Sequence, residues 1–163
     1  MNKKLLFILA WIFLFGTEIC AQDHEDHHTF FRENSVTISA GATSNSEINP
    51  LGLNSRFYYN VSENICFGPE LSWFSVGEGN IFETNFVLHY IFETPLAGVY
   101  PVVGSNYTKE NLGTETHENW NLIFGVGIHR NFGNFGGFAE YTQKRFVHFE
   151  NIFNVGLMYT IHY

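Results

Sequence analysis

The sequence predicts an all-β fold, an eight-stranded antiparallel transmembrane barrel with up-and-down connections that follows a cleavable signal peptide. Three observations lead to this prediction. Apolar and polar residues alternate at a period of two in segment after segment. The chain opens with two lysines and a short apolar run, as exported proteins do. It closes on the alternating segment Val155–Tyr163, which ends on an aromatic residue.

Residues 1–21 have the three parts of a secretory signal peptide. Lys3 and Lys4 form the basic region, and Ala21 suits the last position before cleavage. The apolar run Leu5–Gly16 is too short to span a bilayer as a helix, which needs about 20 residues. We therefore expect export through the secretory pathway, which leaves about 142 residues, the size of one domain.

The segment 22–34, directly after the predicted cleavage site, is rich in histidine and acidic residues. Imidazole and carboxylate groups bind zinc and copper, so weak binding of either ion by His24, His27 and His28 is one hypothesis. The pattern contains no cysteine and matches no structural zinc motif. The alternative is a flexible, solvated leader without a metal. No other cofactor is expected.

Residues 35–163 are expected to form the barrel. Segment Ile81–Phe92 alternates most clearly, with aromatic and aliphatic residues on one face and Glu83, Asn85 and His89 on the other. Aromatic residues near strand ends, such as Phe74 and Tyr100, are expected at the lipid interface. The predicted strands are Ser35–Thr43, Leu53–Val61, Ile65–Ser75, Ile81–Phe92, Gly98–Tyr107, Trp120–Arg130, Phe135–Lys144 and Asn151–Tyr163.

The connections between these strands alternate in length. Ser62–Asn64, Glu93–Ala97 and Asn131–Asn134 are short and turn-like, whereas Ser44–Gly52 and Lys109–Asn119 are longer and more polar. Short turns at one end and longer loops at the other are typical of bacterial outer-membrane barrels. The alternative is a soluble eight-stranded barrel, such as a lipocalin or an avidin-like fold, with its apolar face inward. Charged residues are only 15% of the chain, against roughly 25% in ordinary soluble domains, which favours the membrane barrel.

The residues opposite the apolar faces are expected to fill the lumen, which in an eight-stranded barrel is just wide enough for side chains. Buried charges need partners, so Arg56 and Lys144 should pair with some of the buried glutamates. Such a network would be a polar plug that holds the barrel's shape, or alternatively a narrow path for protons or ions. The predicted lumen residues are Arg56, Glu70, Glu83, His89, His129, Glu140 and Lys144.

No catalytic residues are expected, and the net charge of −8 makes nucleic acid a poor partner. A serine-type site needs a nucleophile beside a base. The C-terminal half offers His129 and Glu140, but no serine follows Ser105. Thr142 is a hydroxyl residue on the same strand face as Glu140.

Four segments together resemble a known family: Cys20–Gln22, Phe67–Trp73, Gly136–Tyr141 and the closing strand through Tyr163. They resemble the small outer-membrane β-barrel ("porin family") proteins of Bacteroidetes-type bacteria, which are similar to the barrel domains of OmpA and OmpX. The resemblance implies a location in the outer membrane of a Gram-negative bacterium, contact with its lipids, and recognition of the terminal strand by the barrel-assembly machinery. The residues that would carry this assembly signal are Val155, Leu157, Tyr159, Ile161 and Tyr163.

The predicted function is a structural or surface-interaction role, with loops such as Lys109–Asn119 meeting an extracellular partner. The first alternative is a minor transport or metal-handling role that uses the histidine-rich leader. The second alternative is a lipid-modifying outer-membrane enzyme.

Overall fold

The computed structural model describes residues 33–46, 51–94, 96–113, 115–145 and 149–162 of the 163-residue chain. The predicted signal peptide, the leader histidines His24, His27 and His28, and the terminal Tyr163 lie outside the described residues. No helix in the described ranges is long and apolar enough to cross a membrane.

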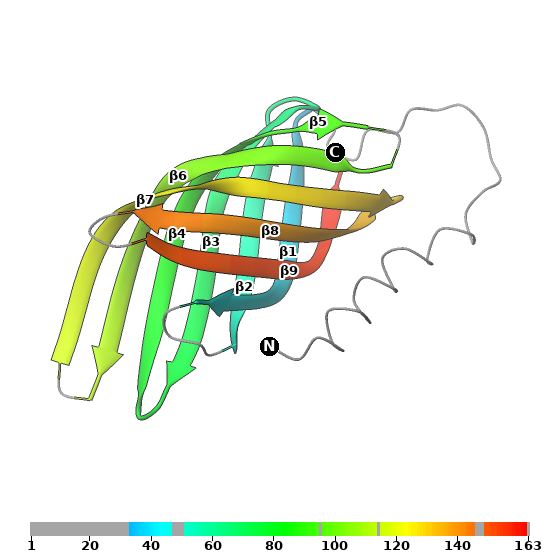
Figure 1. Cartoon of the computed structure of the whole chain (residues 1–163). Helices are drawn as coiled ribbons and strands as arrows, with labels where there is room; N and C mark the ends of the chain where they lie inside the picture. The colour runs from blue at the N-terminus through cyan, green and yellow to red at the C-terminus, as the bar shows by residue number, and fades with distance from the viewer. Residues whose placement is uncertain (1–32, 47–50, 95, 114, 146–148, 163) are drawn as a thin grey trace, which may run out of the picture.

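The described strands form one antiparallel sheet that closes on itself (Figure 1). Eight strands are long, and the two-residue strand β5 continues β4 after a break at Ile91. Pairing of β4 with β6 and of β1 with β9 completes the barrel. The strands are β1 (Ser35–Asn45), β2 (Leu51–Asn60), β3 (Ile65–Val76), β4 (Gly79–Tyr90), β5 (Phe92–Glu93), β6 (Gly98–Leu112), β7 (Glu115–Phe132), β8 (Phe135–Arg145) and β9 (Phe149–Ile161).

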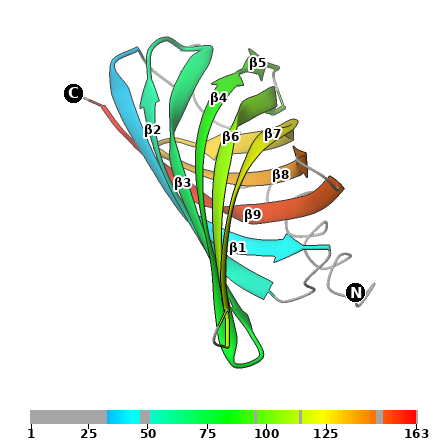
Figure 2. The same cartoon turned by 90° about the vertical axis from the view of Figure 1, so that its left-hand side faces the viewer.

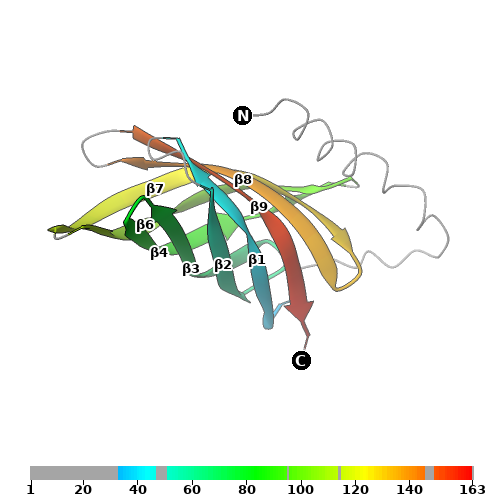
Figure 3. The same cartoon turned by 90° about the horizontal axis from the view of Figure 1, so that it is seen from below.

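The first and last strands lie side by side. Val36 pairs with Ile161 and Ala42 with Val155, and Figure 3 shows β1 between β2 and β9. This pairing of the last strand with the first closes the barrel, as the predicted fold requires. Closure of the sheet leaves neither strand with an open edge along this seam.

Large hydrophobic side chains cover the outside of the barrel, and polar side chains fill its centre. On β4, Phe86 is 54% exposed, whereas the neighbouring Asn85 and Val87 point inward and are buried. Glu70 on β3 is only 1% exposed. A soluble domain has the reverse distribution. This inverted pattern confirms the transmembrane barrel fold over the lipocalin-like alternative.

Two of the aromatic residues expected at the lipid interface point inward instead. Phe74 and Tyr100 are both buried in the lumen. Strand parity decides this, because Phe74 shares its face with Ser72, and Tyr100 shares its face with Val102, which are also buried. The expectation that their position near strand ends places them in lipid is wrong.

The expectation of a loop at Lys109–Asn119 is also wrong. Strand β6 continues to Leu112 and β7 begins at Glu115, so paired strands occupy most of this segment. The hairpin turns at Gly113, and the β3–β4 hairpin turns at Gly77; both glycines have positive φ angles, of 66° and 56°. Figures 1 and 2 show both hairpins extending past the other strands, at the end of the barrel away from the C-terminus. Strands β3, β4, β6 and β7 thus form a four-stranded extension, which we call the protruding sheet.

Candidate functional site

All seven predicted lumen residues lie in the interior, and none is more than 5% exposed. They are contributed by five strands, β2, β3, β4, β7 and β8. They form three groups along the barrel: one near the protruding sheet, one at the centre, and one near the short turns. The register between strands decides which of these residues pair with each other. The sequence alone could therefore predict that they face the lumen, but not which partner each one has.

The central group is built around Arg56. Its Nη1 and Nη2 donate to Oε2 and Oε1 of Glu140, both at 2.9 Å. Its Nε donates to Oδ1 of Asn54 at 2.8 Å and lies 3.4 Å from Oε1 of Glu70. The guanidinium also stacks 4.2 Å from the ring centroid of Phe138. This bidentate, charge-assisted arrangement joins β2 to β8 across the lumen.

Glu70 connects this centre to a row of asparagines. The Tyr58 hydroxyl donates to Glu70, and Asn85 Nδ2 donates to its other oxygen at 3.0 Å. Asn106 then donates to Asn85 at 2.6 Å, and Asn121 donates to Asn106 at 2.9 Å. The row crosses β4, β6 and β7 at matching register positions. Sequence reasoning missed it, although inward parity on three strands was a usable signal.

Near the protruding sheet, Lys144 lies between two carboxylates. Its Nζ is 2.6 Å from Oε1 of Glu83 and 2.8 Å from Oε2 of Glu150. Asn45 Nδ2 donates to the same oxygen of Glu150 at 2.9 Å. Glu150 was missed because the sequence placed it in a connection before the last strand.

Near the short turns, His129 Nε2 is 3.1 Å from Oε1 of Glu93. Tyr100 stacks against both His89 and His129, at centroid distances of 4.7 and 5.7 Å. A Cβ at Gly98 would come within 2.2 Å of the His129 ring, so glycine leaves the space that this ring occupies. His129 pairs with Glu93, whereas Glu140 pairs with Arg56. The histidine and glutamate that the sequence offered as parts of a serine-type site thus belong to two different ion pairs.

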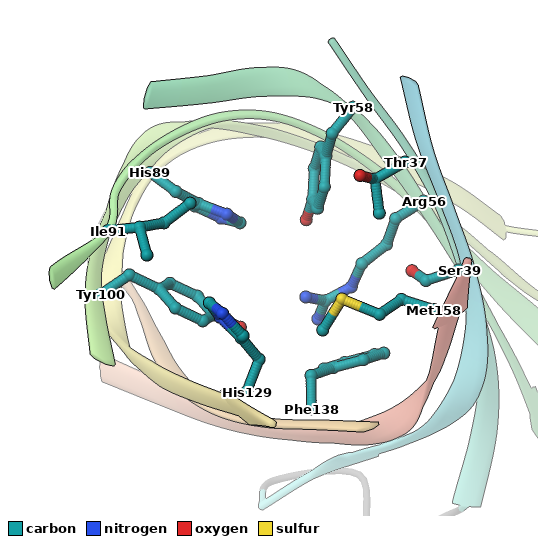
Figure 4. A pocket seen from close by; sticks show the side chains of 10 residues that line it. All are labelled: Thr37, Ser39, Arg56, Tyr58, His89, Ile91, Tyr100, His129, Phe138 and Met158. Carbon is teal, nitrogen blue, oxygen red and sulfur yellow. The ribbon is translucent and has the colours of Figure 1, made fainter. Parts of the chain in front are cut away.

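The remaining lumen space described by the structure includes a cavity of about 10 Å³ among these rings (Figure 4). That is room for about one water molecule. His89, Arg56, Tyr58, Met158 and Phe138 all point into it. The centre of the barrel is thus filled by side chains.

The protruding sheet has an open strand edge. β7 pairs with β8 only from Leu122, opposite Arg145, while its pairing with β6 continues to Glu115. The stretch Glu115–Asn121 consequently has a hydrogen-bonded neighbour on one side only among the described residues. Unpaired backbone groups of this kind can add a strand from another chain.

The protruding sheet is acidic towards its tip. Glu78, Glu110, Glu115 and Glu118 lie there with a single lysine, Lys109, whose Nζ is 3.2 Å from Glu118. A hydrogen bond from the Tyr107 hydroxyl lowers the pKa of the Glu118 carboxyl, and the same bond raises the pKa of Tyr107. Glu118 therefore stays ionised to a lower pH than an isolated glutamate.

Four of the five residues predicted to carry the assembly signal lie in the described part of β9. Leu157 and Ile161 are exposed on the outside of the barrel, and Val155 and Tyr159 are partly exposed. Tyr159 packs on Phe135 of β8, with ring centroids 4.7 Å apart. The outward face of the terminal strand is thus apolar and aromatic.

No protein-family model matches the chain, and no curated protein matches it significantly. Solved structures do match. The structure of Ail, the attachment invasion locus protein of Yersinia pestis, has a TM-score of 0.60 and 17% identity, over 79% of this chain and 99% of that one. Another structure of Ail contains the heparin analogue sucrose octasulfate.

Two barrels of Pseudomonas aeruginosa are also similar. The N-terminal barrel domain of OprF has a TM-score of 0.63 and 18% identity, over 79% of this chain and 98% of that one. The outer membrane protein OprG has a TM-score of 0.55 and 13% identity, over 83% and 99%. The chain therefore has the fold of small outer-membrane β-barrels, similar to that of OmpA and OmpX.

Proposed function

We propose that this chain is a surface-interaction barrel of the bacterial outer membrane, which binds a partner outside the cell through its protruding sheet. The observation that carries this proposal is the edge of β7 over Glu115–Asn121, which among the described residues pairs with β6 alone. Export by a signal peptide at residues 1–21 and an origin in a Bacteroidetes-type bacterium are parts of the same proposal. Ail, which is named for attachment and invasion, shares the fold and supports a surface role.

The partner that fits this edge is an extended protein segment with basic side chains. Main-chain hydrogen bonds to β7 would supply affinity, and basic side chains on either face of the added strand would meet the acidic groups near the tip. Glu115 and Glu118 are both exposed on β7 itself. Sucrose octasulfate, found with Ail, is a polyanion, and the acidic sheet described here would repel such a ligand.

A shortened hairpin tests the proposal. Thr108 pairs with Asn119, so residues 109–118 can be replaced by Asn-Gly, a two-residue turn suited to hairpins. The purified barrel should bind an immobilised peptide of alternating lysine and threonine, in a salt-dependent manner, and the shortened variant should not. Substitution of Glu115→Gln and Glu118→Gln together should weaken binding without shortening the edge.

Heat-modifiable migration in gels must first show that each variant forms the barrel. A matched peptide of alternating glutamate and threonine should not bind, and heparin should not bind either. Equal binding of the basic peptide by the full and shortened barrels would contradict the proposed role of the protruding sheet.

A further inference from the structure

Three donor groups meet at the centre of the lumen, on the side of Glu140 that faces His89. Ligand atoms of Glu70, His89 and Glu140 all lie within 4.8 Å of one another, and all three side chains are buried. One imidazole and two carboxylates are a donor set suited to zinc and similar divalent transition metals. We propose that these three residues bind one divalent transition-metal ion inside the barrel.

His89 is placed as metal-binding histidines are. Its Nδ1 lies 3.6 Å from the Cys66 thiol, and Tyr58 and Tyr100 hold the ring from either side, at centroid distances of 4.9 and 4.7 Å. Its Nε2 lies 3.8 Å from Oε2 of Glu140 and makes no hydrogen bond to the described residues. A ring fixed through one nitrogen and open at the other is oriented for coordination.

The charge balance of the lumen also favours a cation. The buried carboxylates Glu70, Glu83 and Glu140 have only Arg56 and Lys144 as arginine or lysine partners among the ion pairs described above. Three buried carboxylates against two buried cations leave an excess of negative charge, which is costly to keep in a desolvated interior. A divalent ion at the central carboxylates would offset that excess.

Arg56 already occupies both oxygens of Glu140, so the ion has to share that carboxylate. Each carboxylate oxygen has two lone pairs, and Oε2 can accept from Arg56 and still face His89. Arg56 then positions Glu140 for the ion. Ligands of a tetrahedral ion with bonds of about 2.1 Å lie roughly 3.4 Å apart, so the side chains must close slightly around it.

A cavity beside His89 has room for one further ligand. Its volume of about 10 Å³ holds about one water molecule, and of the three donors only His89 lines it, together with Arg56 and Tyr58. Three protein ligands and one water complete the four-coordinate geometry that zinc prefers. Figure 4 shows the His89 side chain directed into this space.

The test uses the exported chain, purified from outer membranes in detergent and carrying His24→Ala, His27→Ala and His28→Ala so that the leader cannot bind metal. Calorimetric titration with zinc chloride should show one ion per barrel. His89→Gln should weaken that binding at least about tenfold. The matched control His117→Gln, an exposed histidine of the protruding sheet, should leave it unchanged.

Cobalt provides a second readout that needs no lumen variant. Cobalt(II) added to the same leader-substituted barrel should replace the spectrum of the hydrated ion with the stronger visible bands of a four-coordinate site. Failure of zinc to bind stoichiometrically, equal binding by a folded His89→Gln barrel, or an unchanged cobalt spectrum would each overturn the proposal. Heat-modifiable migration establishes which variants are folded. If the His89→Gln variant does not fold, the cobalt spectrum of the barrel with an unchanged lumen decides whether the site binds metal.

Discussion

At the scale of single residues, Arg56 is the side chain on which the most contacts converge. It donates two hydrogen bonds to Glu140 and one to Asn54, contacts Glu70, and lies over the ring of Phe138. A buried charge that loses its partner is strongly destabilised, whereas an intact pair adds little over well-packed apolar residues. The network is therefore expected to fix which strands face each other more than to raise stability.

The consequence can be measured with Glu140→Ala. This change leaves Arg56 without its bidentate partner and should lower the free energy of unfolding by about 3–5 kcal/mol. Urea unfolding in lipid vesicles, followed by heat-modifiable migration, gives the value. Glu118→Ala, an exposed carboxylate on the protruding sheet, is the matched control and should change stability far less. An unchanged unfolding midpoint for Glu140→Ala would show that the network has no structural role.

At the scale of elements, the strands have two parts with different surroundings. Within the barrel, one face of each strand is apolar and the other polar, which is the alternation that the sequence displays. At the far end of β7, over Glu115–Asn119, both faces of the strand are polar, so alternation disappears while the backbone ladder to β6 continues. Hydrogen bonds between β6 and β7 do not depend on which side chains they carry.

We propose that the closing strand β9 has a role in assembly that is separate from its contribution to stability. Its outward residues Leu157 and Ile161 are exposed, and it pairs with β1 and β8 along most of its length. Deleting Tyr163 should impair assembly in cells more than it lowers the stability of barrels already folded, because the described pairings end at Ile161. The fraction of heat-modifiable protein in outer membranes measures assembly, and the urea midpoint of the purified barrel measures stability. An equal loss in both would argue against a specific role in assembly.

At the scale of the whole molecule, the sequence predicted more of the fold than of the site. The number of long strands and the division of their residues between two faces follow from period-two patterning, because successive side chains point to opposite sides of a strand. The low content of charged residues then favoured the polar face as the interior. The ion pairs Lys144–Glu83 and Arg56–Glu140 could not be predicted, because they depend on the register between strands that are far apart in the sequence. Local sequence patterns do not contain this register. Glu93 was missed because the sequence placed it in the turn Glu93–Ala97, whereas it ends β5 and contacts His129 from there.

The claim on which the whole account depends is that the aromatic face of the strands meets lipid. Spin labels on single cysteines at Phe86, Val87 and Leu88 of β4 test it directly, in a barrel with Cys66→Ala reconstituted in vesicles. Phe86 and Leu88 are exposed and Val87 is buried, so their labels should report opposite environments.

Labels at Phe86 and Leu88 should be mobile, accessible to oxygen and shielded from a water-soluble nickel complex, while the label at Val87 should be immobile and inaccessible to both. High nickel accessibility at Phe86 and Leu88 would place this face in water and contradict the transmembrane barrel.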